Sequence, residues 1–237
     1  MRLPAIILAA LAFAIPALAS AQSPEQLDQL EPGAGAWQAE YFGTFGPGGA
    51  REHALEAMFG LNDRLAVGVE LEVEYENGGL AFDTLGVKAL YRLTGDEAPV
   101  ALGAQVQLDF DDRAVLAQAE TRLIAEVETE AWWGQANVML RRSRDEGETA
   151  TGFAYAWSLQ HKMGSFAWLG IEGSGQSAAL WRSDGASASP AHFTGPSLTI
   201  EWQPAGAPEI EVGFAYFRRV GGVGPRDSGR VFIQTTF

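Results

Sequence analysis

Catalysis by a hydroxyl nucleophile needs a serine side chain within hydrogen-bonding reach of a histidine. The chain has three histidines at dispersed positions: His53, His161 and His192. His161 lies four residues before Ser165, across an expected turn, so these two side chains form one conceivable pair. His192 follows a serine-rich loop with three further candidate groups: Asp184, Ser187 and Ser189. Serine-rich loops are usually only solvated, and we therefore predict no catalytic residue and no enzymatic activity.

Metal and cofactor chemistry is also not indicated. A structural or catalytic metal site needs clustered histidine or cysteine ligands, and the chain contains no cysteine. The glycine-rich stretch 221–225 lacks the Gly-Lys-Ser/Thr sequence that follows in a phosphate-binding loop. We predict no metal site and no cofactor.

Carboxylates are the most abundant groups that could act on a ligand. The chain has 30 Asp and Glu against 16 Lys and Arg, a formal charge of −14. A chain this acidic does not bind nucleic acid through a general electrostatic contact. Three of the acids, Glu70, Glu72 and Glu74, alternate with apolar residues along the stretch 65–75. A period of two predicts a β-strand with one apolar face and one acidic face.

The elements that must position these side chains are also strands. Alternation recurs along residues 100–109, 153–160 and 210–217, whereas a helix would place apolar residues at i, i+3, i+4 and i+7. The stretch 114–127 is rich in Ala, Glu and Leu, but it also alternates, and we predict a strand there. Clusters of Gly, Pro, Asn, Asp and Ser mark eleven connections. The pattern therefore predicts twelve strands over residues 37–237.

The amino-terminal residues have the features of an export signal. Arg2 precedes an apolar stretch, residues 3–18, and the small residues Ala-Ser-Ala follow at 19–21. We predict a cleaved signal peptide over residues 1–21, whose removal takes away Arg2 and moves the formal charge from −14 to −15. Residues 22–36 are polar and contain prolines and glycines, so we expect a flexible periplasmic segment there.

The last eight residues, 230–237, form one more alternating strand. Four residues share one of its faces: Val231, Ile233, Thr235 and Phe237. This pattern resembles the closing strand of Gram-negative outer-membrane β-barrel proteins, in which a terminal aromatic residue is part of an assembly signal. The resemblance implies an all-β fold, a transmembrane antiparallel up-and-down β-barrel of twelve strands in the bacterial outer membrane. It also implies outer-membrane lipid and the outer-membrane assembly machinery as partners.

A soluble β-sandwich would also alternate apolar and polar residues. Aromatic residues near strand ends, such as Trp37, Trp132 and Trp202, favour a membrane barrel because interfacial girdles occupy those places. No predicted strand is apolar on both faces, as inner strands of some sandwiches are. Pairing of the last strand with the first would also remove both sheet edges. These features together favour the barrel.

An apolar exterior would turn the polar faces into the barrel lumen. The candidate lumen residues are Glu70, Glu72, Glu74, Lys88, Gln105, Gln118, Glu120, Arg122 and Arg141. Simple hairpin registers place five of them in one belt: Glu70, Lys88, Gln105, Gln118 and Arg141. Such a belt either neutralises itself as a structural network or forms a constriction that favours cations. Four large inward residues could block a twelve-strand lumen: Phe42, Leu90, Trp133 and Trp168.

Three functions remain open at this point. The first is a small channel that passes small polar or cationic solutes, with the lumen carboxylates setting its selectivity. The second is a closed structural or interaction barrel that binds a partner through the outer connections 177–190 and 220–229. The third is an enzyme acting on outer-membrane lipid, for which the pair His161 and Ser165 lies at the periplasmic end, away from the outer leaflet.

Overall fold

The computed structural model describes residues 24–30, 32–46, 51–76, 79–95, 97–145, 148–177, 180–182 and 190–237. The predicted signal peptide, residues 1–21, lies outside these ranges, and so does most of the connection 177–190. Within the described residues no helix has the length and apolar character needed to cross a membrane.

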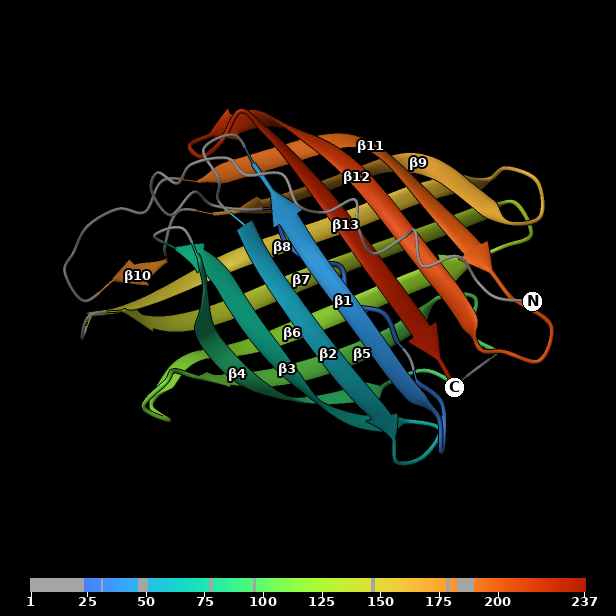
Figure 1. Cartoon of the computed structure of the whole chain (residues 1–237), viewed down its shortest axis with the longest axis horizontal. Coiled ribbons are helices and arrows are strands. Elements are labelled where there is room, and N and C mark those ends of the chain that lie inside the picture. The colour runs from blue at the N-terminus through green and yellow to red at the C-terminus, as the bar shows by residue number, and fades with distance from the viewer. Residues whose placement is uncertain are drawn as a thin grey trace.

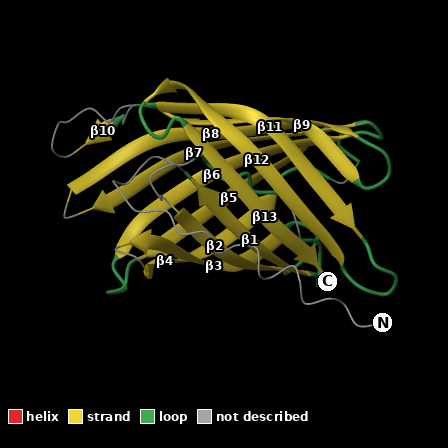
Figure 2. Ribbon diagram, turned by 45° about the horizontal axis from the view of Figure 1, so that its top comes forward, coloured by secondary structure: helices red, strands yellow, loops and turns green. Residues whose placement is uncertain are grey.

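Twelve antiparallel strands close into a barrel (Figures 1 and 2). They are β1 (Trp37–Phe45), β2 (Arg51–Gly60), β3 (Leu65–Glu76), β4 (Gly79–Arg92), β5 (Ala101–Phe110), β6 (Leu116–Glu128), β7 (Trp132–Asp145), β8 (Glu148–Lys162), β9 (Ala167–Gln176), β11 (Ala191–Trp202), β12 (Glu209–Gly222) and β13 (Asp227–Thr236). A thirteenth strand, the two-residue β10 (Trp181–Arg182), pairs with the outer part of β8 and is not part of the closed wall. The predicted all-β, twelve-strand, up-and-down barrel is confirmed.

The last strand pairs with the first, as the alternating carboxyl-terminal residues suggested. β1 and β13 are antiparallel, with Phe42 opposite Phe232, and Figure 1 shows them side by side. Trp37 and Phe237 then exchange two backbone hydrogen bonds: Trp37 N–H to Phe237 O at 2.7 Å and Phe237 N–H to Trp37 O at 2.8 Å. This closure satisfies the backbone groups that an open sheet edge would expose.

The burial pattern is the reverse of that in a water-soluble protein. Leu55 on β2 and Leu123 on β6 are 57% and 56% exposed on the outside, whereas Glu120 and Arg122 are nearly fully buried inside. Soluble proteins rarely bury charged side chains while they expose leucine side chains. An apolar exterior around a polar interior is the arrangement of a barrel that lies in lipid. The outward apolar faces also exclude the soluble sandwich.

The two ends of the barrel differ in their connections. The end that carries Trp37 and Phe237 has short turns, whereas the opposite end carries the longest connection, residues 177–190. Because outer-membrane barrels have short periplasmic turns and longer outer loops, we assign the first end as the periplasmic mouth and the other as the outer mouth. Aromatic residues exposed on the outside mark the periplasmic mouth: Trp37, Tyr91, Trp132 and Trp202. They form the girdle expected at a membrane interface.

Candidate functional site in the barrel lumen

The nine candidate lumen residues all lie on the inner face of the wall. Glu70, Lys88, Gln105, Glu120 and Arg122 are buried, and the other four are partly exposed to the lumen. They come from five neighbouring strands, β3 to β7, because polar residues recur at every second position of each strand. The alternation in the sequence was therefore sufficient to place them.

The registers between these strands differ from the simple hairpin registers. Lys88 lies opposite Gln107, which lies opposite Glu120, which in turn lies opposite Arg141. On the other side Lys88 lies opposite Gly68, so Glu70, Gln105 and Gln118 are each displaced by two residues from the belt that was predicted. The pairing of β4 with β5 is regular, and irregularities follow only beyond the belt, after Glu72 and after Asp109. Alternation alone fixes neither the registers nor these irregularities.

One half of the lumen network is centred on Lys88. Its ammonium group lies 2.7 Å from a carboxylate oxygen of Glu70 and also pairs with Glu56. Gln107 donates to the second oxygen of Glu70 at 2.8 Å, so both oxygens of this carboxylate are engaged. Beside this group, Gln118 donates to Asp109 at 3.2 Å. Lys88 is thus one cation beside the three carboxylates of Glu56, Glu70 and Asp109.

The other half is centred on Glu120, which lies between two arginines. Arg122 Nη2 is 2.9 Å from Glu120 Oε1, and Arg141 Nη2 is 2.6 Å from Glu120 Oε2. Each arginine still has donors left over, because a guanidinium group has five N–H bonds. Those remaining donors point to a part of the chain that is not in the wall.

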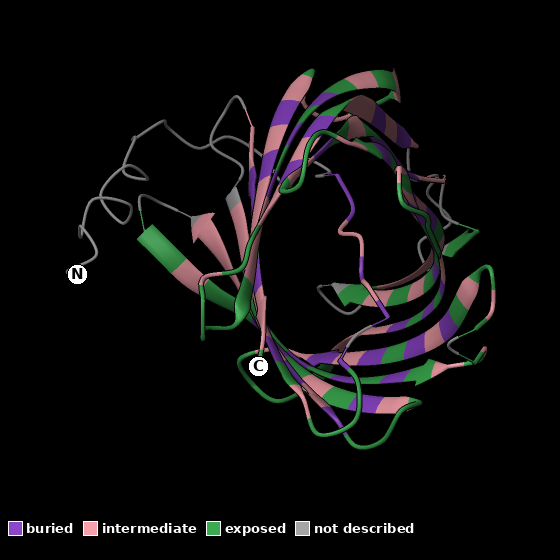
Figure 3. Ribbon diagram, turned by 90° about the vertical axis from the view of Figure 1, so that its right-hand side faces the viewer, coloured by how far each residue is buried: buried purple, intermediate pink, exposed green. Residues whose placement is uncertain are grey.

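Residues 24–30 run through the lumen instead of lying in the periplasm. Figure 3, a view along the barrel, shows their trace inside the ring of strands. Glu25, Asp28 and Leu30 are at most 7% exposed. This placement differs from the flexible periplasmic segment expected for residues 22–36. The expectation assumed that a polar stretch stays in water, but here the polar interior of the barrel solvates it.

Asp28 makes the densest set of contacts in this segment. Arg122 Nη1 lies 2.8 Å from its carboxylate, Gln105 donates to the same carboxylate, and Lys88 Nζ is 4.0 Å away. Its backbone is held as well: the N–H donates to Asn137 Oδ1 at 2.8 Å, and the C=O accepts from Gln135 at 2.8 Å. Side chains from four strands, β4 to β7, therefore converge on one aspartate.

Glu25 lies nearer the outer mouth than Asp28 does, and it is also held by side chains of the wall. Arg141 donates to both of its carboxylate oxygens, at 3.1 Å and 2.8 Å, and Gln176 donates to one of them. Its backbone N–H donates to Ser174 Oγ at 3.2 Å, and Arg230 donates to its C=O at 3.3 Å. Arg230 itself pairs with Glu172, which comes from the strand β9.

Leu30 is the apolar contact of the segment. It belongs to a buried cluster with Met58, Ala66, Leu90 and Ile124. A Cβ atom at Gly103 would collide with the Leu30 side chain, so the absence of a side chain at position 103 makes room for it. Leu27 packs in the same way against a second cluster of Met139, Ala154 and Ala156. The inner wall is thus shaped to hold this segment.

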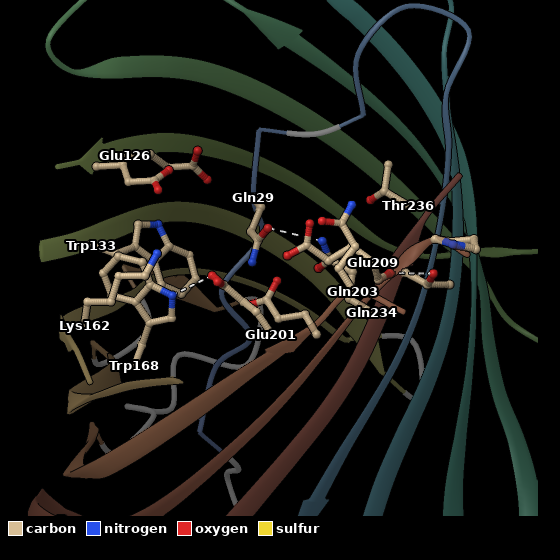
Figure 4. A pocket seen from close by; sticks show the side chains of 14 residues that line it. Gln29, Glu126, Trp133, Lys162, Trp168, Glu201, Gln203, Glu209, Gln234 and Thr236 are labelled. Carbon is tan, nitrogen blue, oxygen red and sulfur yellow. Dashed lines mark hydrogen bonds between the residues drawn. The ribbon is translucent and has the colours of Figure 1, made fainter. Parts of the chain in front are cut away.

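Two water-accessible cavities remain on either side of the segment. The periplasmic one has a volume of about 590 Å³ and the outer one about 260 Å³, while a space of only about 20 Å³ lies beside Leu27 and Gln29. Figure 4 shows Gln29 extending from the segment into the periplasmic cavity, where Gln234 donates to it at 3.3 Å. The segment therefore stands between the two mouths.

Both cavities are lined by more acids than bases. The outer cavity has seven carboxylates, Glu25, Glu52, Glu70, Glu72, Glu74, Asp83 and Glu120, against the cations Lys88, Arg122 and Arg141. The periplasmic cavity has five carboxylates, Glu126, Glu128, Glu201, Glu209 and Glu211, against Lys162. This surplus of carboxylates gives both cavities a negative potential.

The four large residues expected to block the lumen play smaller roles. Phe42 is buried beneath Arg230, with 5.7 Å between the guanidinium carbon and the ring centre. Leu90 packs around Leu30, and Trp133 meets Trp168 edge to face at the wall of the periplasmic cavity (Figure 4). Each lies against the wall or the segment, and residues 24–30 are what fill the space between the cavities.

His161 and His192 lie apart from the lumen network, whereas His53 borders the outer cavity and hydrogen-bonds the Tyr41 hydroxyl. His161 packs its ring against Trp132, at 4.7 Å between ring centres, and Ser165 lies in the following turn. His192 accepts or donates a hydrogen bond at 2.9 Å with the Tyr155 hydroxyl, and the loop serines and Asp184 lie outside the described residues. In the described ranges no group of three or more His, Cys, Asp or Glu residues is arranged to hold a metal ion.

Comparison with known proteins identifies the architecture. The chain is similar to a NanC porin, with a TM-score of 0.56, 11% sequence identity, and coverage of 84% of this chain and 98% of the porin. It is similar to the COG4313 outer membrane channel from Pseudomonas putida F1, with a TM-score of 0.59, 14% identity, and coverage of 90% and 100%. A KdgM porin aligns with a TM-score of 0.50 at 10% identity, over 84% and 99% of the two chains.

No protein-family model matches the sequence, and no curated protein matches it either. Identities of 10–14% carry the fold alone. The chain is thus a twelve-strand antiparallel β-barrel with the fold of these outer-membrane channels.

Proposed function

We propose that the protein is a small outer-membrane channel that prefers small cationic and polar solutes. The observation that carries this proposal is the surplus of carboxylates in both cavities, seven against three at the outer mouth and five against one at the periplasmic mouth. Rings of acidic side chains in a pore raise the local concentration of cations and repel anions. The similar folds reported above, which belong to a porin and an outer membrane channel, are consistent with a conducting barrel.

The test is the reversal potential of the purified full-length protein in a planar bilayer under a KCl gradient. A cation preference is expected, and it should fall in the double variant Glu72→Gln/Glu74→Gln, whose side chains line the outer cavity. Glu130→Gln is the matched control, because Glu130 lies in an exposed turn outside the cavity linings. An anion preference, or an unchanged preference in the double variant, would contradict the proposal.

A closed interaction barrel is the second candidate, and the filled lumen favours it. In that case the outer connections 177–190 and 220–229 would be the binding surface. Of these, 220–229 forms the end of the β12–β13 hairpin, where Arg219 N–H donates to Arg226 O at 2.8 Å. If the inserted wild type and all lumen variants show no conductance step, the result would contradict the channel and favour the closed interaction barrel.

A further inference from the structure

We propose that residues 24–30 are a displaceable plug that gates the channel, held in the lumen by the carboxylates of Glu25 and Asp28. The proposal rests on the channel function above and names how that channel is regulated. The plug separates the outer cavity of about 260 Å³ from the periplasmic cavity of about 590 Å³. Its departure would join them into one passage.

The plug has no strand pairing with the wall. Residues 24–29 have no regular secondary structure, and wall side chains satisfy the plug's backbone groups. Examples are Asn137 for the Asp28 N–H, Arg122 for the Gln26 C=O at 3.2 Å, and Glu126 for the Leu30 N–H at 3.0 Å. Release of the plug therefore breaks side-chain contacts only, and every backbone ladder of the barrel stays intact.

The cations that hold the plug would not be left unpaired by its release. Arg122 and Arg141 both retain Glu120, and Lys88 retains Glu56 and Glu70. Arg230 retains Glu172. An orphaned buried charge is among the largest penalties in a protein. Here each of these cations still contacts a wall carboxylate after release, with Glu120 shared between Arg122 and Arg141. The carboxylates of Glu25 and Asp28 would meanwhile regain water, so the closed and released states are balanced electrostatically.

A hinge lies between the plug and the barrel. Gly35 has a φ of 77°, which glycine adopts without strain, and its N–H donates to Gly60 O at 2.8 Å. Position 60 must also be glycine for close approach, since a Cβ there would collide with the Gly33 carbonyl. The turn is thus fixed at the periplasmic mouth, and the plug would leave on that side.

A reversible lock, a disulfide bond between the plug and the barrel wall, tests the proposal directly. The chain has no cysteine, so Leu30→Cys/Gly103→Cys would contain a single possible disulfide. A Cβ built at Gly103 lies 3.6 Å from Leu30 Cγ, near the place where a cysteine sulfur at position 30 would lie, so the two thiols would be neighbours. We expect no conductance from the oxidised variant in planar bilayers and restored conductance after reduction. Leu30→Cys alone is the control and should conduct in both conditions.

A release variant tests the same idea without a crosslink. Glu25→Gln/Asp28→Asn removes both carboxylates from the plug and should increase the fraction of time that the full-length channel is open. Heat-modifiable migration on SDS gels would verify that each variant has a folded barrel. Two results together would overturn the plug: equal conductance of the disulfide variant before and after reduction, and an open fraction of the release variant equal to that of wild type. The channel function would then still stand. If no folded variant conducts, both the plug and the channel function would be overturned.

Discussion

Arg141 donates to both carboxylate oxygens of Glu25, at 3.1 Å and 2.8 Å, and its Nε donates to Glu120 Oε2 at 2.7 Å. One guanidinium group therefore joins the lumen segment to the barrel wall. Arg122 repeats the arrangement with Asp28 and the other oxygen of Glu120. Glu120 is the wall carboxylate that both arginines share, and its removal should change how strongly they hold the segment.

Glu120→Gln should therefore lower the open fraction of the channel. Without this carboxylate, release of residues 24–30 would leave Arg122 and Arg141 with none of the acidic partners described above. Breaking a buried ion pair from one side costs about 3–5 kcal/mol, which would oppose release. Single-channel recording measures this fraction. Asp109→Asn is the matched control, because Asp109 is equally buried but accepts its hydrogen bonds from the neutral amides of Gln107 and Gln118.

Two leucines of one cluster should behave differently when truncated. Leu30 lies on the segment and Leu90 on β4, and both are buried in contact with Met58, Ala66 and Ile124. Truncation of a buried leucine typically costs about 2–5 kcal/mol. Leu90→Ala should lower the free energy of unfolding of the whole barrel, as measured by urea titration in lipid vesicles. Leu30→Ala should leave that value near wild type, since the segment can detach locally, and should raise the open fraction instead. A global loss of similar size for both variants would show that the segment unfolds only with the barrel.

Phe237→Ala should slow or reduce insertion into membranes. The Phe237 side chain is 62% exposed on the outside, and its backbone completes the pairing with Trp37. The alternating residues Val231, Ile233, Thr235 and Phe237 remain the predicted assembly signal. Folding yield in vesicles and assembly in cells would measure the effect, with Phe214→Ala as control because Phe214 is 49% exposed on the adjacent strand β12. The ion selectivity of correctly inserted Phe237→Ala protein should be unchanged. Normal assembly of this variant would show that the terminal aromatic residue is incidental.

The fold could be predicted because lipid imposes a period of two. Along β3 every second residue must be apolar to face lipid, so Val67, Val69 and Leu71 reveal the strand and also place Glu70 inside. The pairing of β1 with β13 follows from the need to remove open edges in a membrane. These constraints act locally along the chain or on the whole sheet, and the sequence carries them directly.

The registers were harder because alternation does not fix how two strands align, even where their pairing is regular, and irregularities in pairing leave no clear sequence signal. The shift after Asp109 brings Phe110 opposite Leu116, and Ala114 takes a φ of 56° in the turn between them. A displacement of two residues preserves the inward and outward faces, so the alternation is the same in either register. This is why Gln105 and Gln118 were placed in the wrong row although they face the lumen.

Residues 24–30 were missed because their contacts are distant in sequence and have no period. Asp28 meets Gln105, Arg122 and Asn137, which lie about a hundred residues further along the chain. One sequence signal was present: a twelve-strand barrel is wider than an eight-strand barrel, whose interior its own side chains just fill. The lumen of a twelve-strand barrel must therefore hold water or another part of the chain. Leu27 and Leu30 are apolar residues in the polar stretch 22–36, and their spacing suits contacts with the inner wall.

The hydrogen bonds between Trp37 and Phe237 fix the root of the amino-terminal segment at the closing seam of the barrel. Thirteen residues, 24–36, extend from that root. Fully stretched, they would reach about 45 Å, at 3.3–3.6 Å for each residue. A released segment would therefore extend from the periplasmic mouth as a flexible tether, long enough for a soluble periplasmic protein to bind. A force on that segment would act first on the pair of β1 and β13, which joins the first strand of the barrel to the last.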